Sequence, residues 1–149
     1  MRNRIYLDTS VISALFDERT PERMKQTKQT WENELPEYEV FISSTVLTEL
    51  SNATTALKGL FLNAIDGFTV LEATDEAFSL ADEYVNIGIF PEKYYDDALH
   101  VAIAATNGIP VLLSWNFTHL VKIKTRRMVA LVNTEKNYLP VEIIAPPEL

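Results

Sequence analysis

The sequence contains no cysteine, which excludes disulfides, cysteine-ligated zinc or iron–sulfur sites and a thiol nucleophile. This composition suits a reducing cytoplasm, where we expect the protein to work. No apolar run approaches the length of a membrane-spanning helix. The first residues also lack the long apolar region of a signal peptide, so we expect none.

Glycine is scarce as well, with only four in 149 residues and no cluster among them. A nucleotide-binding Rossmann domain needs clustered glycines that let phosphates approach the backbone, so this class is excluded. A phosphatase of the haloacid dehalogenase type needs a second aspartate two positions after the first. In this chain Ser10 stands two positions after Asp8, which disfavours that class.

Positive charge is in short supply, because 13 Lys and Arg face 21 Asp and Glu for a net charge of −8. Taken alone, this charge argues against nucleic-acid binding, which relies on basic side chains. The imbalance is concentrated in residues 31–100, with fourteen acidic and two basic side chains. The segments on either side each carry a net charge of +2. We therefore expect an acidic flank and a mildly basic one.

The length and the 47% hydrophobic content are those of a globular domain, and we expect a single domain over residues 1–149. Short apolar runs, typical of buried parallel strands, occur at residues 5–7, 40–42, 68–71, 111–113 and 141–144. Helical patterns lie between them, at residues 11–16, 20–34, 46–57, 74–84, 96–106 and 128–132. This alternation predicts an α/β fold, a three-layer α/β/α sandwich with a mostly parallel central sheet.

Four polar residues fall on one edge of the predicted sheet. Asp8 follows the first strand, Asn116 follows the strand at residues 111–113, and Asp97 begins a helix. Glu49 lies about one turn into the helix after the second strand. In α/β folds, ligands bind beside the carboxyl ends of the strands, where the helices begin. The sequence therefore predicts that these four side chains meet.

Carboxylates that converge in this way suit a divalent cation. Glu49 borders the buried face of its helix, where an unpaired carboxylate is costly. Neighbouring carboxylates also raise one another's pKa. Mg²⁺ and Mn²⁺ relieve both penalties, since they accept oxygen ligands, and such an ion can activate a water and neutralise charge on a phosphodiester.

Each residue also has a structural explanation. Asp8 and Asp97 suit helix N-termini, Glu49 suits a helix surface, and Asn116 suits an Asx-turn. We expect His100 to be a buried, hydrogen-bonded histidine rather than a ligand. The remaining candidates are assigned to the surface or to packing, namely His119, Trp115 and Phe117.

Five segments resemble the motifs of PIN-domain proteins, in the same order along nearly the whole chain. They are residues 5–12 (IYLDTSVI), 47–50 (LTEL), 97–104 (DALHVAIA), 112–121 (LLSWNFTHLV) and 141–148 (VEIIAPPE). The resemblance implies an α/β/α sandwich and an Mg²⁺- or Mn²⁺-dependent endoribonuclease. Small bacterial and archaeal members are often toxins of the VapC type that an antitoxin protein holds inactive, and homodimers are common among them.

By position, the resemblance makes Asp8, Glu49 and Asp97 the catalytic residues and metal ligands, with Asn116 as a further ligand. Asn116 stands where the family commonly has aspartate, so the site has three carboxylates and a weaker case for two tightly held ions. Hydroxyl groups next to these residues would orient the ligands or their waters, namely Thr9, Ser10 and Ser114. Basic residues after the fourth motif would contact RNA phosphates or form an ordinary solvated face, namely Lys122, Lys124, Arg126 and Arg127.

Three functions remain open on the sequence alone. The main prediction is an RNA-cleaving hydrolase, with an antitoxin helix docking near residues 20–34 and with a second copy of the chain as a further partner. The alternative is a catalytically weak or inactive PIN-like binding module, which Asn116 and the acidic charge favour. A relative that cleaves DNA is a further alternative, because the sequence does not separate the two nucleic acids.

Overall fold

A five-stranded sheet forms the centre of the computed structural model, which describes residues 2–149. Every neighbouring pair of strands in it is parallel, and the strand order is β3-β2-β1-β4-β5. The strands are β1 (Asn3–Leu7), β2 (Tyr38–Ser43), β3 (Thr69–Leu71), β4 (Val111–Leu113) and β5 (Glu142–Ile144). All five predicted strands are confirmed, and the sheet is wholly rather than mostly parallel.

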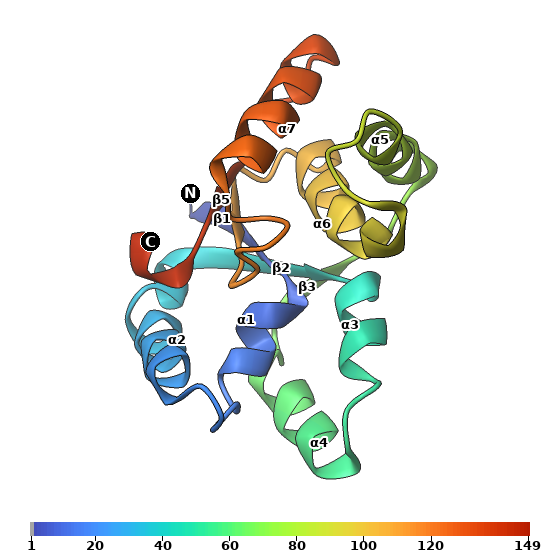
Figure 1. Cartoon of the computed structure of the whole chain (residues 1–149). Coiled ribbons are helices and arrows are strands. Elements are labelled where there is room, and N and C mark those ends of the chain that lie inside the picture. The colour runs from blue at the N-terminus through green and yellow to red at the C-terminus, as the bar shows by residue number, and fades with distance from the viewer. Residues whose placement is uncertain (1) are drawn as a thin grey trace.

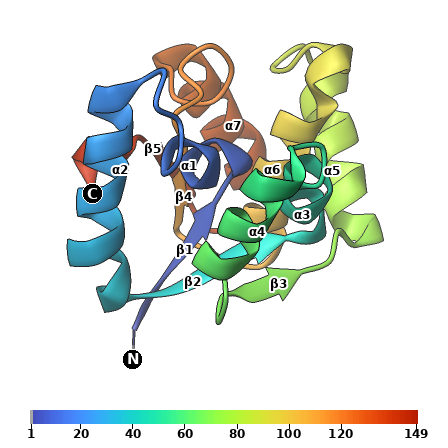
Figure 2. The same cartoon turned by 90° about the horizontal axis from the view of Figure 1, so that it is seen from below.

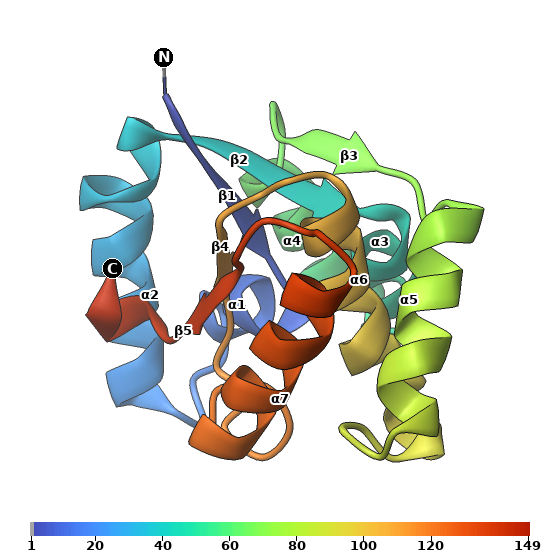
Figure 3. The ribbon, with the colours of Figure 1, turned by 90° about the horizontal axis from the view of Figure 1, so that it is seen from above.

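Helices cover both faces of the sheet, so the predicted three-layer α/β/α fold is confirmed. They are α1 (Thr9–Ala14), α2 (Pro21–Asn33), α3 (Ser44–Leu50), α4 (Thr55–Ala64), α5 (Asp75–Asn86), α6 (Tyr95–Thr106) and α7 (Ile123–Glu135). Figure 1 shows α1, α2 and α4 on one side of the sheet and α5, α6 and α7 on the other. The views from below and above show these two helical layers in turn (Figures 2 and 3).

The neighbouring strands β1 and β4 and helix α6 form the buried core of the protein. The residues of β1 and β4 at its centre are fully buried, as expected for strands covered on both faces, namely Ile5, Tyr6, Leu7, Leu112 and Leu113. Helix α6 is buried over eight consecutive residues, Ala98 to Ala105, and packs against α5. Asp97, at its start, is therefore attached to a firmly held element.

Two predicted helices differ from the structure. The single helix expected over residues 46–57 is wrong, because α3 ends at Leu50 and α4 begins at Thr55. Thr54 caps the new helix by accepting a hydrogen bond from the Leu57 N–H. Short polar side chains such as Ser51, Asn52 and Thr54 compete with helical backbone bonds. The helix expected at residues 128–132 is the middle of the longer α7.

The strand order also creates the crevice that holds the polar residues. From β1 the chain moves first to β2 on one side and later to β4 on the other, so the order reverses between β1 and β4. In open α/β sheets ligands bind at such a switch point, at the carboxyl ends of the strands. Asp8 follows β1, and its N–H donates a hydrogen bond to the carbonyl oxygen of Leu113 at the end of β4 (3.2 Å).

Hydropathy adds one finding about the helices. Within residues 2–149, none of them has the length and apolar character needed to cross a membrane.

Candidate metal and catalytic site

Asp8 is a buried carboxylate, 3% exposed, that hydroxyl groups hold from both sides. Ser10 Oγ donates to Asp8 Oδ1 (2.6 Å) and Ser114 Oγ donates to Asp8 Oδ2 (2.5 Å). Ser10 is itself fixed, because its Oγ accepts a hydrogen bond from the Trp115 N–H (2.8 Å). Burial raises the pKa of Asp8, although the charge of His100 and the two serine bonds oppose this rise. Asp8 is thus firmly oriented, and its charge is largely removed from water.

Glu49, on α3, is held through one of its two oxygens. Its Oε1 accepts hydrogen bonds from Thr9 Oγ1 (2.7 Å) and from His100 Nε2 (2.7 Å). Burial would raise the pKa of Glu49, but the bond to His100, the charge of His100 and the Thr9 bond outweigh it and lower the pKa. Glu49 is therefore ionised at neutral pH, and both of these donors bond to Oε1 rather than to Oε2.

A chain of buried polar groups extends from Glu49 into the core. His100 Nδ1 lies 2.6 Å from the Tyr6 hydroxyl, which lies 2.7 Å from Ser43 Oγ. When His100 is neutral, Tyr6 donates to Nδ1 and Ser43 donates to Tyr6; when His100 is protonated, both bonds reverse. Burial lowers the pKa of His100, but Glu49, Asp8 and Asp97 together raise it above its usual value.

Asp97 lies in the first turn of α6 and is half-buried. Burial is the main cause that raises its pKa to about 6, and the charges of Asp8 and Glu49 add to this effect against the opposing charge of His100. Asn116 Nδ2 donates a long hydrogen bond to Asp97 Oδ2 (3.3 Å). The three carboxylates are thus near enough to repel one another.

These residues fit a hard divalent cation by their chemistry, because they offer carboxylate oxygens, and burial raises the pKa of Asp8 and of Asp97 above the ordinary range. Their geometry is not yet that of a bound ion. Within residues 2–149, no three His, Asp or Glu side chains are already grouped as a metal site. Binding would require the carboxylates to draw together, and the long Asn116–Asp97 bond is the contact most easily given up for this.

The structure brings most of the predicted residues into direct contact and divides the rest. Asp8 meets Ser10 and Ser114, Glu49 meets Thr9, and Asp97 meets Asn116. The four basic residues after the fourth motif do not form one patch. Lys122 and Lys124 line the same small cavity, whereas Arg126 Nη1 lies 3.4 Å from the carbonyl oxygen of Ile143 and 3.9 Å from Glu148 Oε2. Arg127 is exposed on α7.

Sequence reasoning missed three members of the site. His100 is buried and hydrogen-bonded, as predicted, but one of its partners is Glu49, so it belongs to the site itself. A signal for this was available, because His100 follows Asp97 by three residues and therefore shares its face of the helix. Tyr6 and Ser43 gave no such signal, since one lies in an apolar strand and the other is typical of a helix cap.

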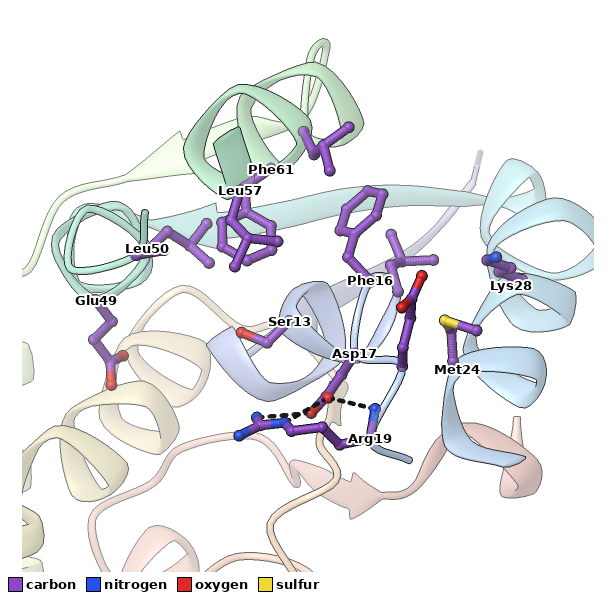
Figure 4. Close-up of a pocket in the computed structure, with 14 residues that line it drawn as sticks. Ser13, Phe16, Asp17, Arg19, Met24, Lys28, Glu49, Leu50, Leu57 and Phe61 are labelled. Atoms are coloured by element: carbon purple, nitrogen blue, oxygen red, sulfur yellow. Dashed lines mark hydrogen bonds and ion pairs between the residues drawn. The ribbon is translucent and has the colours of Figure 1, made fainter. Parts of the chain in front are cut away.

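A groove of about 770 Å³ opens beside Glu49, between α1, α2, α3 and α4. Figure 4 shows Glu49 at one end of it and apolar side chains, including Leu57 and Phe61, along one wall. Polar groups line another part, where Arg19 Nε donates to Asp17 Oδ1 (2.9 Å). A partner segment in this groove would reach the candidate site.

A family model described as the PIN domain matches residues 5–116 of this chain. The chain belongs to the PIN-domain family. The matched range begins in β1 and ends at Asn116, so it contains all four residues predicted to meet at the carboxyl ends of the strands. A comparison with curated proteins gives no match.

Solved structures share the fold of this PIN domain. VapC20 of Mycobacterium tuberculosis, described as a toxin that cleaves the sarcin–ricin loop, is 21% identical with a TM-score of 0.59, over 77% of this chain and 92% of that one. A toxin–antitoxin complex from Klebsiella pneumoniae is 16% identical with a TM-score of 0.65, over 95% and 97%. VapBC-1 of nontypeable Haemophilus influenzae is 14% identical with a TM-score of 0.59, over 97% and 98%.

Proposed function

We propose that this PIN domain is a metal-dependent endoribonuclease that uses Mg²⁺ or Mn²⁺ held by Asp8, Glu49 and Asp97. The observation that carries the proposal is that three carboxylates gather at the switch point of the sheet, where Asp8 and Glu49 both repel Asp97 and raise its pKa. Family membership supports it, because PIN nucleases generally use divalent metal ions. The likeness to VapC20, a toxin that cleaves an RNA loop, supports RNA as the substrate.

When bound, the divalent ion lowers the pKa of a water and neutralises charge that develops on the phosphodiester. The residues of the chain supply orientation. Ser10 and Ser114 hold both oxygens of Asp8, so the carboxylate keeps one direction. Thr9 and His100 hold Oε1 of Glu49, which leaves Oε2 to bind the ion or to accept a proton from water.

Asn116 has a different part in this proposal from the three carboxylates. Its Oδ1 accepts a hydrogen bond from the His119 N–H (2.9 Å), and its Nδ2 faces Asp97. This arrangement suits a residue that positions Asp97, and an amide oxygen brings no negative charge to an ion. We therefore assign Asn116 the weaker contribution to metal binding.

We further propose that the nuclease is the toxin of a toxin–antitoxin pair. Two of the similar structures are themselves toxin–antitoxin assemblies. The groove beside Glu49 supports a peptide partner, because it is lined partly by Met24 and Lys28 of α2, the helix near which an antitoxin was expected to dock. Coexpression with the product of a neighbouring reading frame should give a complex that does not cleave RNA, and free nuclease activity in that complex would refute the pairing.

A homodimer is a further proposal, which light scattering of the purified chain would test.

The nuclease proposal is tested by incubating the purified chain with a mixture of structured RNAs and the matching DNA, in Mn²⁺, Mg²⁺ or EDTA. We expect RNA cleavage in either metal, none in EDTA and none by Asp8→Asn. Asp96→Asn is the matched control, because it removes an exposed carboxylate beside Asp97 from the same helix. Cleavage by Asp8→Asn at the rate of the unmodified chain would contradict the proposal, and binding of Mn²⁺ without cleavage would favour an inactive binding module.

A further inference from the structure

A second polar cavity is lined by residues that follow Asn116 in the same loop. Its volume is about 240 Å³, and it lies between the loop before α6 and the segment that leads into α7. Its polar lining contains no acidic side chain and consists of Thr118, His119, Lys122, Lys124 and Thr125, which we call the basic pocket. In a chain of net charge −8, a pocket with two lysines and no carboxylate is an exception to the overall field.

A third lysine adds to this local positive charge. The charges of Lys122 and Lys93 both lower the pKa of His119, in the same direction as its partial burial. Lys93, Lys122 and Lys124 are all exposed. Mobile ammonium groups around a small cavity are suited to an anionic group such as a phosphate.

A close, tilted pair of aromatic rings lies at the basic pocket, which one of the two rings lines. The rings of Tyr94 and His119 lie 3.9 Å apart between centroids at an interplanar angle of 33°, and Tyr94 is 37% exposed. Lys93 Nζ lies 5.1 Å from the centre of the Tyr94 ring. Proteins that bind single-stranded nucleic acids combine exposed aromatic rings with basic side chains, so that bases stack on the rings and phosphates contact the cations.

The Tyr94–His119 pair is joined to the candidate site by a short stretch of chain and by two hydrogen bonds. Tyr94 precedes Asp97 by three residues at the start of α6. The N–H of His119 donates to Asn116 Oδ1, and Asn116 Nδ2 donates to Asp97. These connections suit a single RNA strand that contacts both the ring pair and the carboxylates.

We propose that Tyr94 and His119 stack an unpaired base of the RNA, next to the cleavage position, while Lys93, Lys122 and Lys124 bind the adjoining phosphate. This inference rests on the proposed function, because it extends the substrate of the same site. It also specifies the form of that substrate. A base can lie on the rings only when it is splayed out of a helix, so the pocket selects single-stranded or looped RNA over duplex RNA.

The test measures binding of a fluorescein-labelled single-stranded RNA of about 12 nucleotides, within the usual range of single-strand site sizes, by anisotropy. EDTA is present so that no cleavage occurs. The variants are Tyr94→Ala and the double variant Lys122→Gln/Lys124→Gln. Tyr94→Phe keeps the ring, and Lys25→Gln/Lys136→Gln removes the same charge from exposed positions outside the basic pocket. Circular dichroism verifies that each variant is folded.

We expect Tyr94→Ala to weaken binding about 5- to 150-fold, the range for removal of one stacked base, and Tyr94→Phe to bind nearly normally. The Lys122→Gln/Lys124→Gln variant should bind more weakly and with a flatter salt dependence, by about 0.7 in log–log slope for each phosphate that it no longer neutralises. The Lys25→Gln/Lys136→Gln control should keep an affinity and a salt dependence closer to those of the unmodified chain. Duplex RNA of the same length should bind more weakly and show no effect of Tyr94→Ala.

Equal affinity of the unmodified chain and the basic-pocket variants would overturn the inference, as would a failure of the unmodified chain to bind the RNA. If the Lys122→Gln/Lys124→Gln variant loses binding of an acidic peptide but still binds RNA normally, the result would overturn the inference in favour of a protein partner. Cleavage in Mn²⁺ is scored separately. Cleavage with unchanged binding in the variants defeats only this inference, whereas pocket-dependent binding without cleavage defeats only the nuclease proposal.

Discussion

Replacing Asp97 with asparagine should stabilise the metal-free protein while it disables the site. Asp97 has a pKa of about 6 in the folded chain, against about 3.9 for an aspartate in an unfolded chain. Each pKa unit corresponds to about 1.4 kcal/mol, so ionised Asp97 costs at most about 3 kcal/mol of folding free energy at neutral pH. Asp97 is only half-buried, and solvent screening reduces this gain to about 1–2 kcal/mol.

The pH dependence of this gain has a defined sign. Because the folded pKa of Asp97 is raised, its cost is absent below the unfolded pKa near 4 and grows as the pH rises through 6. Asparagine does not titrate and can still accept the hydrogen bond from Asn116. The stability advantage of Asp97→Asn should therefore be close to zero at about pH 4 and complete by about pH 7.

Urea denaturation in EDTA between about pH 4 and 8 measures this advantage, with Asp96→Asn as the charge-matched control because Asp96 is exposed on the same turn. Saturating Mn²⁺ should reverse the order, since an ion that binds only the folded protein stabilises the unmodified chain by mass action. A stability advantage that does not vary with pH, or that Asp96→Asn shares, would refute the conclusion that Asp97 has a raised pKa in the folded protein.

Substitutions at three further positions test other parts of the account. His100→Gln removes the cation that lowers the pKa of Glu49, so the acidic limb of the pH–rate profile should move to higher pH, and an unchanged limb would argue against the Glu49–His100 pairing. Asn116→Asp adds a fourth carboxylate, so it should tighten Mn²⁺ binding in calorimetry and lower the melting temperature in EDTA; weaker Mn²⁺ binding would contradict this. Gly108 has φ +63° and room for a Cβ, so Gly108→Ala should cost about 1 kcal/mol through the backbone alone, and Gly108→Asn, measured beside it in urea, should cost less.

The sequence predicted most of the architecture because the relevant signals are local and periodic. Short apolar runs marked all five strands, and a nearly continuous apolar pattern marked buried α6. The break between α3 and α4 escaped, since Val46, Leu50, Ala53 and Leu57 keep helical spacing across it. Ser51, Asn52 and Thr54 outweigh that spacing by offering caps and turns.

The candidate site was predicted as far as topology determines it. Strand ends and helix starts placed Asp8, Glu49 and Asp97 on one edge without any knowledge of side-chain contacts. The contacts themselves depend on tertiary packing, and so the link from Glu49 through His100 to Tyr6 was not foreseen. The separation of the four basic residues at positions 122–127 has the same cause. The first turns of α7 point Lys124 toward the cavity beside the loop before α6, whereas Arg126 and Arg127 do not line it.

The most direct test of the central claim is a calorimetric titration of Mn²⁺ into the unmodified chain and into Asp8→Asn, Asp97→Asn and Asp96→Asn. The account predicts that the unmodified chain and Asp96→Asn bind Mn²⁺ alike, and that Asp8→Asn and Asp97→Asn lose this binding. Equal binding by all four proteins, or no binding by any of them, would contradict a metal site built on these carboxylates.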